Sequence, residues 1–145
     1  MTGSAPGSGA DGPGEPEDQE SLWAGPLGKA LLLIDLLTVE KRWEAFLPGI
    51  DRHWVYCATA DGPAAALLRF QPGACVPLHE HRGYEHIFVL QGEQADENGI
   101  ATAGSLLVHP PGTRHRVVSA TGCMVLAIYE KPVRFIEPLP RLRAI

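Results

Sequence analysis

The feature that most constrains the fold is a series of short extended runs separated by turn residues. After Pro48-Gly49, runs rich in aliphatic and aromatic residues recur about every ten residues and end at Gly, Pro or Asp-Gly. These runs span residues 53–59, 64–70, 75–78, 85–91, 105–110, 114–119 and 123–129. Their length and spacing predict an all-β antiparallel sandwich or barrel. The Asn98-Gly99 pair also predicts a tight hairpin.

The length of 145 residues predicts one folded domain, preceded by a tail. Residues 1–20 contain five Gly and three Pro, and they lack Val, Ile, Leu, Phe, Trp and Tyr. Such a segment cannot bury enough apolar surface to offset the entropy of ordering it, so we expect a disordered acidic tail. The domain is expected to span residues 21–145. Within it, residues 29–46 fit a helix or a strand equally well.

The distribution of charge excludes some function classes. The net charge is −5, and residues 1–20 carry five acidic residues but no Lys or Arg, so the remainder is formally neutral. A neutral body argues against nucleic-acid binding, which needs a basic face. The chain has no run of 18 apolar residues and no secretory signal, so we expect no membrane association. Three widely spaced cysteines suit a reducing, cytoplasmic location.

The segment that carries chemistry begins with a pair of histidines. On a strand, His79 and His81 point to the same face, whereas on a helix they would lie about 200° apart. Pro77 and Gly83 argue against a helix here. Glu85 follows a three-residue turn, so its carboxylate should lie beside the two imidazoles if the strands on either side of the turn pair.

A second segment supplies a fourth candidate ligand. Pro110-Pro111-Gly112 predicts a tight turn, and His115 begins the strand that leaves it. Three imidazoles and one carboxylate suit a borderline divalent metal such as zinc, iron, manganese, nickel or copper. His86 should point away from this group, and His109, just before the turn, is expected to have a structural role. Cys75 shares the parity of His79 and is therefore expected to face the interior.

The two segments resemble the two motifs of the cupin superfamily, G-x5-H-x-H-x3-E-x6-G and G-x5-P-x-G-x2-H-x3-N. Every fixed position matches except the last, where Ser119 replaces Asn; the matching residues are Gly73, His79, His81, Glu85, Gly92, Gly104, Pro110, Gly112 and His115. The resemblance implies a single-domain jelly-roll β-barrel over residues 40–135. It also implies that the metal ligands are His79, His81, Glu85 and His115.

The chain also resembles, more specifically, the cupin-like domain of ChrR-type anti-sigma factors. The supporting features are the Trp43-x-x-Phe46-x-Pro48-Gly49 lead-in and the ending Thr121-Gly122-Cys123. This resemblance implies a bacterial protein and a homodimer. The sequence has no His-x3-Cys-x2-Cys of the zinc-binding module that grips the sigma factor in that family. We therefore expect no direct sigma-factor binding.

Two functions remain open at this point. One is a regulatory module in which a divalent metal, preferably zinc, is held by three His and one Glu and reports a small ligand or an oxidant. The other is a small iron-dependent dioxygenase acting on a diketone-like or enolisable substrate. The short connection between Gly92 and Gly104, and a cysteine expected inside the barrel, favour the sensing module.

Overall fold

The structure, a computed structural model, describes residues 33–140, so the predicted tail of residues 1–20 lies outside the described part. Within these described residues, one short helix precedes ten strands. The elements are α1 (Leu33–Thr38), β1 (Glu44–Leu47), β2 (Ile50–Cys57), β3 (Ala64–Phe70), β4 (Ala74–Glu80), β5 (Glu85–Asp96), β6 (Gly99–Thr102), β7 (Leu106–His109), β8 (Arg114–Ser119), β9 (Cys123–Tyr129) and β10 (Arg134–Phe135).

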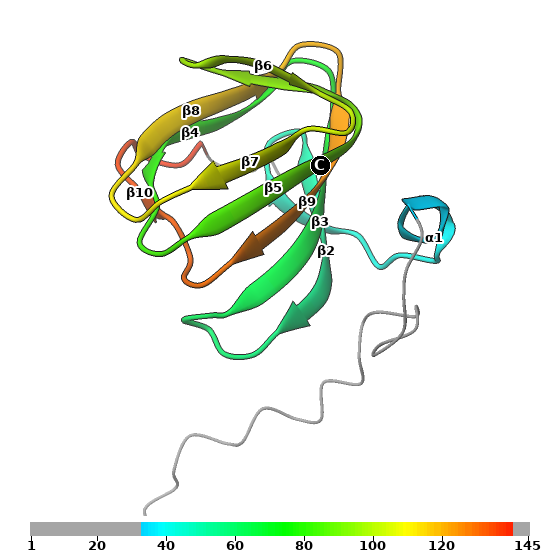
Figure 1. The fold of residues 1–145 in the computed structure, drawn as a ribbon, viewed down its shortest axis with the longest axis horizontal. Coiled ribbons are helices and arrows are strands. Elements are labelled where there is room, and N and C mark those ends of the chain that lie inside the picture. Colours follow the sequence, from blue (N-terminus) through cyan, green and yellow to red (C-terminus); the bar gives the residue numbers. More distant parts are fainter. Residues whose placement is uncertain (1–32, 141–145) are drawn as a thin grey trace, which may run out of the picture.

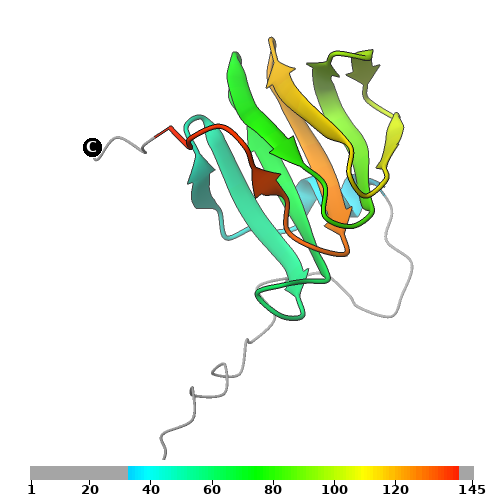
Figure 2. The same cartoon turned by 90° about the vertical axis from the view of Figure 1, so that its left-hand side faces the viewer.

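All strand pairs are antiparallel and follow the order β1-β2-β3-β9-β5-β8-β4-β10, with β6 and β7 both pairing with β5. In Figure 1, β7, β5, β9, β3 and β2 lie side by side, and β8, β4 and β10 form the opposite wall. Figure 2 shows the same strands curling around a common interior. The predicted jelly-roll barrel is confirmed.

The strand β5 joins the two walls. Its first half pairs with β9 and β7, and its second half pairs with β6 and, at Ala95, with Val118 of β8. Gly92 lies where β5 passes from one wall to the other, and its φ of 71° belongs to the left-handed region. A Cβ at this position would stand 2.1 Å from the carbonyl oxygen of Gly122. Only glycine therefore fits at this crossing.

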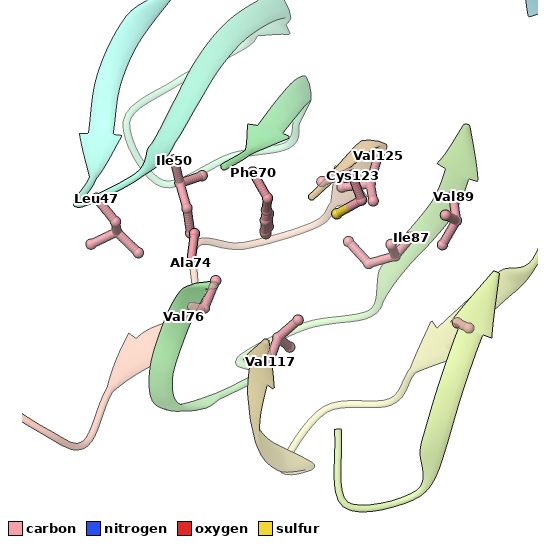
Figure 3. Packing of buried hydrophobic residues seen from close by; sticks show 12 residues of the cluster. Leu47, Ile50, Phe70, Ala74, Val76, Ile87, Val89, Val117, Cys123 and Val125 are labelled. Carbon is pink, nitrogen blue, oxygen red and sulfur yellow. The ribbon is translucent and has the colours of Figure 1, made fainter. Parts of the chain in front are cut away.

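Alternate residues of the strands fill the interior. The core is apolar and includes Ile50, Phe70, Val89 and Val125, each at most 5% exposed. These four residues lie on the adjacent strands β2, β3, β5 and β9, and Figure 3 shows Val76 and Val117 of the opposite wall across the interior from them. The alternation of buried and exposed residues is clearest along β8, whose burial changes at every position. This period of two is the pattern of a strand with one face toward the core.

The helix α1 packs on the outside of the barrel. Its Leu36 and Leu37 join a second apolar cluster with Leu67 and Leu126 of the underlying strands. The stretch 29–46, for which the sequence left helix and strand open, contains both within its described part: α1 is followed by the start of β1. No helix within residues 33–140 has the length and apolar character needed to cross a membrane.

The expectation that Cys75 faces the interior is wrong, because Cys75 is exposed. The register between β4 and β8 shifts between Val76 and His79. Val76 lies opposite Val117 and His79 opposite His115, so β4 holds one more residue than β8 in this interval. A bulge of this kind reverses the alternation of faces, and the parity of His79 therefore does not extend back to Cys75.

Candidate metal centre

Both walls of the barrel contribute to one histidine-rich cluster. His79 lies directly opposite His115 in the β4–β8 register, and Glu85 lies directly opposite His109 in the β5–β7 register. His81 follows β4, in the connection that leads to β5. The cluster therefore contains one cross-strand pair from each wall of the barrel. His81 lies between the two pairs.

The side chains of the cluster are in close contact. The Nε2 atom of His81 lies 2.8 Å from Oε2 of Glu85. The ring centroids of His79 and His115 are 4.6 Å apart, and those of His109 and His115 are 4.4 Å apart. One ligand atom from each of His81, Glu85, His109 and His115 lies within 4.8 Å of the others. Donors bound to one ion at about 2.1 Å each stand at most about 4.2 Å apart, so small side-chain rotations would bring these four atoms to one ion.

Hydrogen bonds orient three of the imidazoles. The Nδ1 atom of His79 lies 2.8 Å from the carbonyl oxygen of Pro77, and Nδ1 of His115 lies 2.9 Å from Oδ2 of Asp96. Nδ1 of His81 lies 3.0 Å from the hydroxyl oxygen of Thr113 and 3.2 Å from its carbonyl oxygen. An Nδ1–H donated to such acceptors leaves the Nε2 lone pair available, which is the usual arrangement of metal-binding histidines.

Burial favours the neutral form of imidazoles in the cluster, which is the form that binds a metal cation. Burial, together with the smaller effect of the neighbouring imidazoles, lowers the pKa of His79 and lowers that of His109 to about 4. Burial alone would raise the pKa of Asp96, but hydrogen bonds from His115 and from the Asn98 N–H outweigh it and lower that pKa. Neutral imidazoles beside carboxylates are the donor set that borderline divalent metals prefer. The residues present therefore fit such an ion.

The four ligands predicted from sequence all lie in this region, but one has a different position from the others. His81, Glu85 and His115 share the tight group of donors, and His79 lies beside it with its ring 5.2 Å from that of His81. The structure adds His109, for which the sequence predicted a structural role. The signal that could have found it is the alternation along β7, where Leu106 and Val108 are exposed and His109 lies on the other face.

The route by which Glu85 reaches the histidines differs from the expected one. The strands before and after the turn, β4 and β5, do not pair; β4 pairs with β8 and β10. The turn of residues 82–84 crosses from one wall of the barrel to the other instead. His81 and Glu85 consequently meet across the interior, and not across a hairpin.

A cavity of about 150 Å³ adjoins the cluster. His79, Glu85, Gln94 and His115 line it, together with apolar side chains that include Val117. Further lining comes from β1, β2 and the segment after β9, through Phe46, Arg52, Pro132, Val133 and Phe135. His81 and His109 are not among the lining residues. The cluster thus has one side toward the cavity and one side away from it.

An antiparallel jelly-roll barrel with histidines and a glutamate gathered inside defines a cupin. A family model described as the ChrR cupin-like domain matches residues 34–133, and the chain therefore belongs to the ChrR cupin-like domain family. The anti-sigma-E factor ChrR of Cereibacter sphaeroides is 34% identical over 103 residues. That match covers 70% of this chain and 47% of ChrR, so the chain spans about half the length of this relative.

Solved structures agree on the fold. A crystal structure of Rhodobacter sphaeroides SigE in complex with the anti-sigma ChrR matches with a TM-score of 0.58 and 29% identity, covering 63% of this chain and 50% of the matched one. An acetylacetone dioxygenase from Acinetobacter johnsonii matches with a TM-score of 0.61 and 18% identity, covering 66% of this chain and 72% of the matched one. The second likeness shows a shared cupin fold.

Proposed function

We propose that the domain binds a divalent metal, preferably zinc, through His79, His81, Glu85 and His115, and that the metal-loaded site senses a small ligand or an oxidant. The observation that carries this proposal is the convergence of oriented imidazoles and a carboxylate beside a cavity. The ChrR chain of the similar structure is bound to SigE. Because this chain corresponds to about half of ChrR, the proposal is limited to the cupin-like domain.

The lining of the cavity favours sensing over catalysis. Glu85 is the only carboxylate among the lining residues of the described chain, and in this proposal it is occupied as a metal ligand. Within residues 33–140, no second carboxylate lines the cavity to serve as a general base. Cys75 is exposed, so an interior cysteine no longer counts among the reasons for preferring the sensing module. The lining residues therefore suit ligand binding better than catalysis by proton transfer.

The cavity also limits the ligand. A cavity of about 150 Å³ with apolar walls holds one benzene-sized molecule. The walls contact the apolar part of such a molecule, and an oxygen donor on it would face the cluster. We therefore propose a small, mainly apolar ligand that carries a carboxylate, enolate or carbonyl oxygen.

Metal analysis and thermal melting test the proposal. Protein purified without added metal should contain about one ion per chain, mainly zinc. Benzoate, acetylacetone and hydrogen peroxide serve as probes of ligand and oxidant response. At least one of them should shift the melting temperature of the zinc-loaded protein and leave that of the metal-free protein unchanged. A full-length, folded protein that binds no divalent metal would contradict the proposal.

The cavity beside the cluster also supports a second candidate, a small iron-dependent dioxygenase. Bound iron would supply Lewis-acid and redox chemistry to an enolisable substrate. The sensing proposal predicts no oxygen uptake when the iron-loaded protein receives acetylacetone or a flavonol. Robust, iron-dependent uptake that disappears in Glu85→Ala would replace the sensor with the enzyme.

A further inference from the structure

We propose that His109 is a fifth metal ligand, supplied by β7, and that it helps to determine which metal the site selects. The inference rests on the proposed metal site and goes beyond the four ligands that the motifs predict. It makes the site a set of four histidines and one glutamate. His109 would bind the ion on the side away from the cavity.

The fold places His109 inside the barrel. Along β7, Leu106 and Val108 are 61% and 49% exposed, whereas His109 lies on the opposite face of the strand. The β5–β7 register sets His109 directly opposite Glu85. Residues directly opposite each other in an antiparallel pair carry their side chains on the same face. His109 and Glu85 therefore reach the interior together.

The ring of His109 is held against those of two predicted ligands. It stacks on His81 with an interplanar angle of 4° and a centroid distance of 4.7 Å, and its centroid lies 4.4 Å from that of His115. A ring nitrogen of His109 belongs to the group of donors that lie within 4.8 Å of one another. By contrast, His79 is not a member of that group.

A second observation is independent of the ring positions. The Nε2 atom of His109 is fully buried and has no hydrogen-bond partner among the described residues. A buried polar nitrogen without a partner costs free energy, because it has lost its hydrogen bond to water. Coordination of a metal ion would remove that cost. The ligands His79, His81 and His115 show the complementary pattern, in which Nδ1 is hydrogen-bonded.

The position of His109 has a consequence for metal choice. His79, Glu85 and His115 line the cavity, and the stacked pair of His81 and His109 does not. Five protein donors exceed the four positions of tetrahedral zinc, but they fit an octahedral ion and leave one position for an exogenous ligand. We therefore expect His109 to reduce, without reversing, the preference of the site for Zn²⁺ over ions such as Co²⁺ and Ni²⁺.

Co²⁺ is a direct probe of this arrangement, because its visible absorption is weak with five or six donors and strong with four. The full chain is freed of metal with a chelator and titrated with Co²⁺ alone. In His109→Ala the absorption should intensify, and the affinity for Co²⁺ should fall by about tenfold or more. Competition between Ni²⁺ and Zn²⁺ should shift toward Zn²⁺ in the same variant. His86→Ala is the matched control, because His86 is exposed on β5. The Co²⁺ spectrum of this variant should equal that of the wild type.

Two further variants separate loss of a ligand from loss of the fold. His109→Gln keeps a polar side chain of similar size and should give the spectral change of His109→Ala. In His109→Gly, added imidazole should restore the wild-type spectrum, which a purely structural role would not produce. If folded His109→Gln keeps the wild-type Co²⁺ spectrum and affinity, the inference about His109 is wrong. Co²⁺ binding by the wild type would still support the proposed metal site in that case. A wild type that binds no Co²⁺, Ni²⁺ or Zn²⁺ would overturn both.

Discussion

At the scale of single residues, what distinguishes the cluster is how each imidazole is held. His79, His81 and His115 each place Nδ1 next to an oxygen acceptor from a different segment: a carbonyl two residues upstream, Thr113 and Asp96. These contacts fix the rings before any ion arrives, so little conformational entropy is lost on binding. The site is therefore organised by its surroundings as well as by its ligands.

The first prediction concerns the ligands. His81→Ala and His115→Ala should each reduce the bound metal from about one ion per chain to a small fraction of that, because each removes an oriented donor. His86→Ala should leave the metal content unchanged. The measurement is elemental analysis of protein purified in parallel. Equal losses in His86→Ala and His81→Ala would mean that the strand register around Glu85 is wrong by one residue.

The second prediction concerns His53, which lies away from the cluster. His53 is fully buried, burial lowers its pKa, and the Arg42 N–H donates to its Nδ1 at 3.0 Å. Below about pH 6.5 the unfolded chain binds a proton here that the folded chain does not, so the free energy of unfolding falls as the pH falls. His53→Asn keeps an acceptor near the Nδ1 position and cannot titrate.

Denaturant unfolding of the metal-free protein at several pH values between 6.5 and 5 tests this prediction. The dependence of the unfolding free energy on pH should become shallower in His53→Asn, by at most about 1.4 kcal/mol per pH unit. The lowered pKa values of His79 and His109 leave part of the dependence in place. An unchanged slope would show that His53 takes up its proton equally in both states.

At the scale of elements, two strands depart from simple alternation, and both departures serve the site. The bulge in β4 turns His79 inward and Cys75 outward. The long strand β5 begins at Glu85 in one wall and ends at Asp96 in the other, where Asp96 hydrogen-bonds His115. One strand thus supplies a proposed ligand at one end and the support of another ligand at the other end.

A pair of glycine substitutions tests the crossing in β5. Gly73 and Gly92 both have positive φ, but a Cβ at Gly73 would meet nothing within 4 Å, whereas one at Gly92 would meet the Gly122 carbonyl. Gly73→Ala should cost about 1–2 kcal/mol of unfolding free energy from the backbone conformation alone. Gly92→Ala should cost about 3 kcal/mol or more. Equal costs in chemical denaturation would show that the crossing relaxes around the methyl group.

We propose that the exposed outer face of β7 and β9 forms a homodimer interface. Leu106, Val108 and Ile128 are all at least 40% exposed, and Val108 and Ile128 lie on either side of His86 in the register of β5. In Figure 1 the strands β7, β5 and β9 lie side by side. Contiguous exposed apolar side chains of this kind mark interaction surfaces.

Sedimentation equilibrium checks this interface. The wild type should be dimeric at micromolar concentration, and Leu106→Glu should be monomeric because a carboxylate would be buried in the contact. Ile100→Glu is the control, since Ile100 is 67% exposed on β6 and lies outside this face. A wild-type monomer, or a dimer lost equally in both variants, would contradict the assignment.

At the scale of the whole molecule, the sequence predicted the features that depend on neighbouring residues and missed those that depend on pairing between distant segments. The bounds of β3, β8 and β9 coincide with runs read directly from the sequence, because alternation within one strand is a local property. The strand β6 and the second half of β5 were missed, since Gly92 indicated a strand end where the chain instead bends between walls. The predicted hairpin is present, but Gly99 begins β6 and the pair at the turn is Asp96 with Gly99.

The site shows the same division. The spacing of the motifs identified His79, His81, Glu85 and His115 as candidate metal ligands from the sequence alone. His109 lies outside the motif spacing; alternation along β7 indicates the face on which it lies, but its position opposite Glu85 depends on the register of β7 against β5. Long-range pairing of this kind is not contained in local periodicity.

Metal removal should weaken the whole barrel, because the proposed ligands tie its two walls together. Binding to the folded state alone stabilises it by about 2.7 kcal/mol at a free metal concentration one hundred times Kd. A chelator should therefore lower the melting temperature by several degrees, and zinc should restore it. In His115→Ala neither treatment should change the melting temperature. A chelator effect that persists in His115→Ala would place the stabilising ion elsewhere.

The way the cluster is assembled also constrains the order of events during synthesis. Its donors extend from His79 to His115, and the wall that carries Glu85 is completed by β9, which ends at Tyr129. A nascent chain still held at residue 100 has neither His109 nor His115, and it lacks the strand beside Glu85. The ion must therefore be acquired late, after the chain as far as β9 has been synthesised. Cellular delivery of the metal would therefore act on an assembled barrel, and a shortage of metal would leave that barrel formed but unloaded.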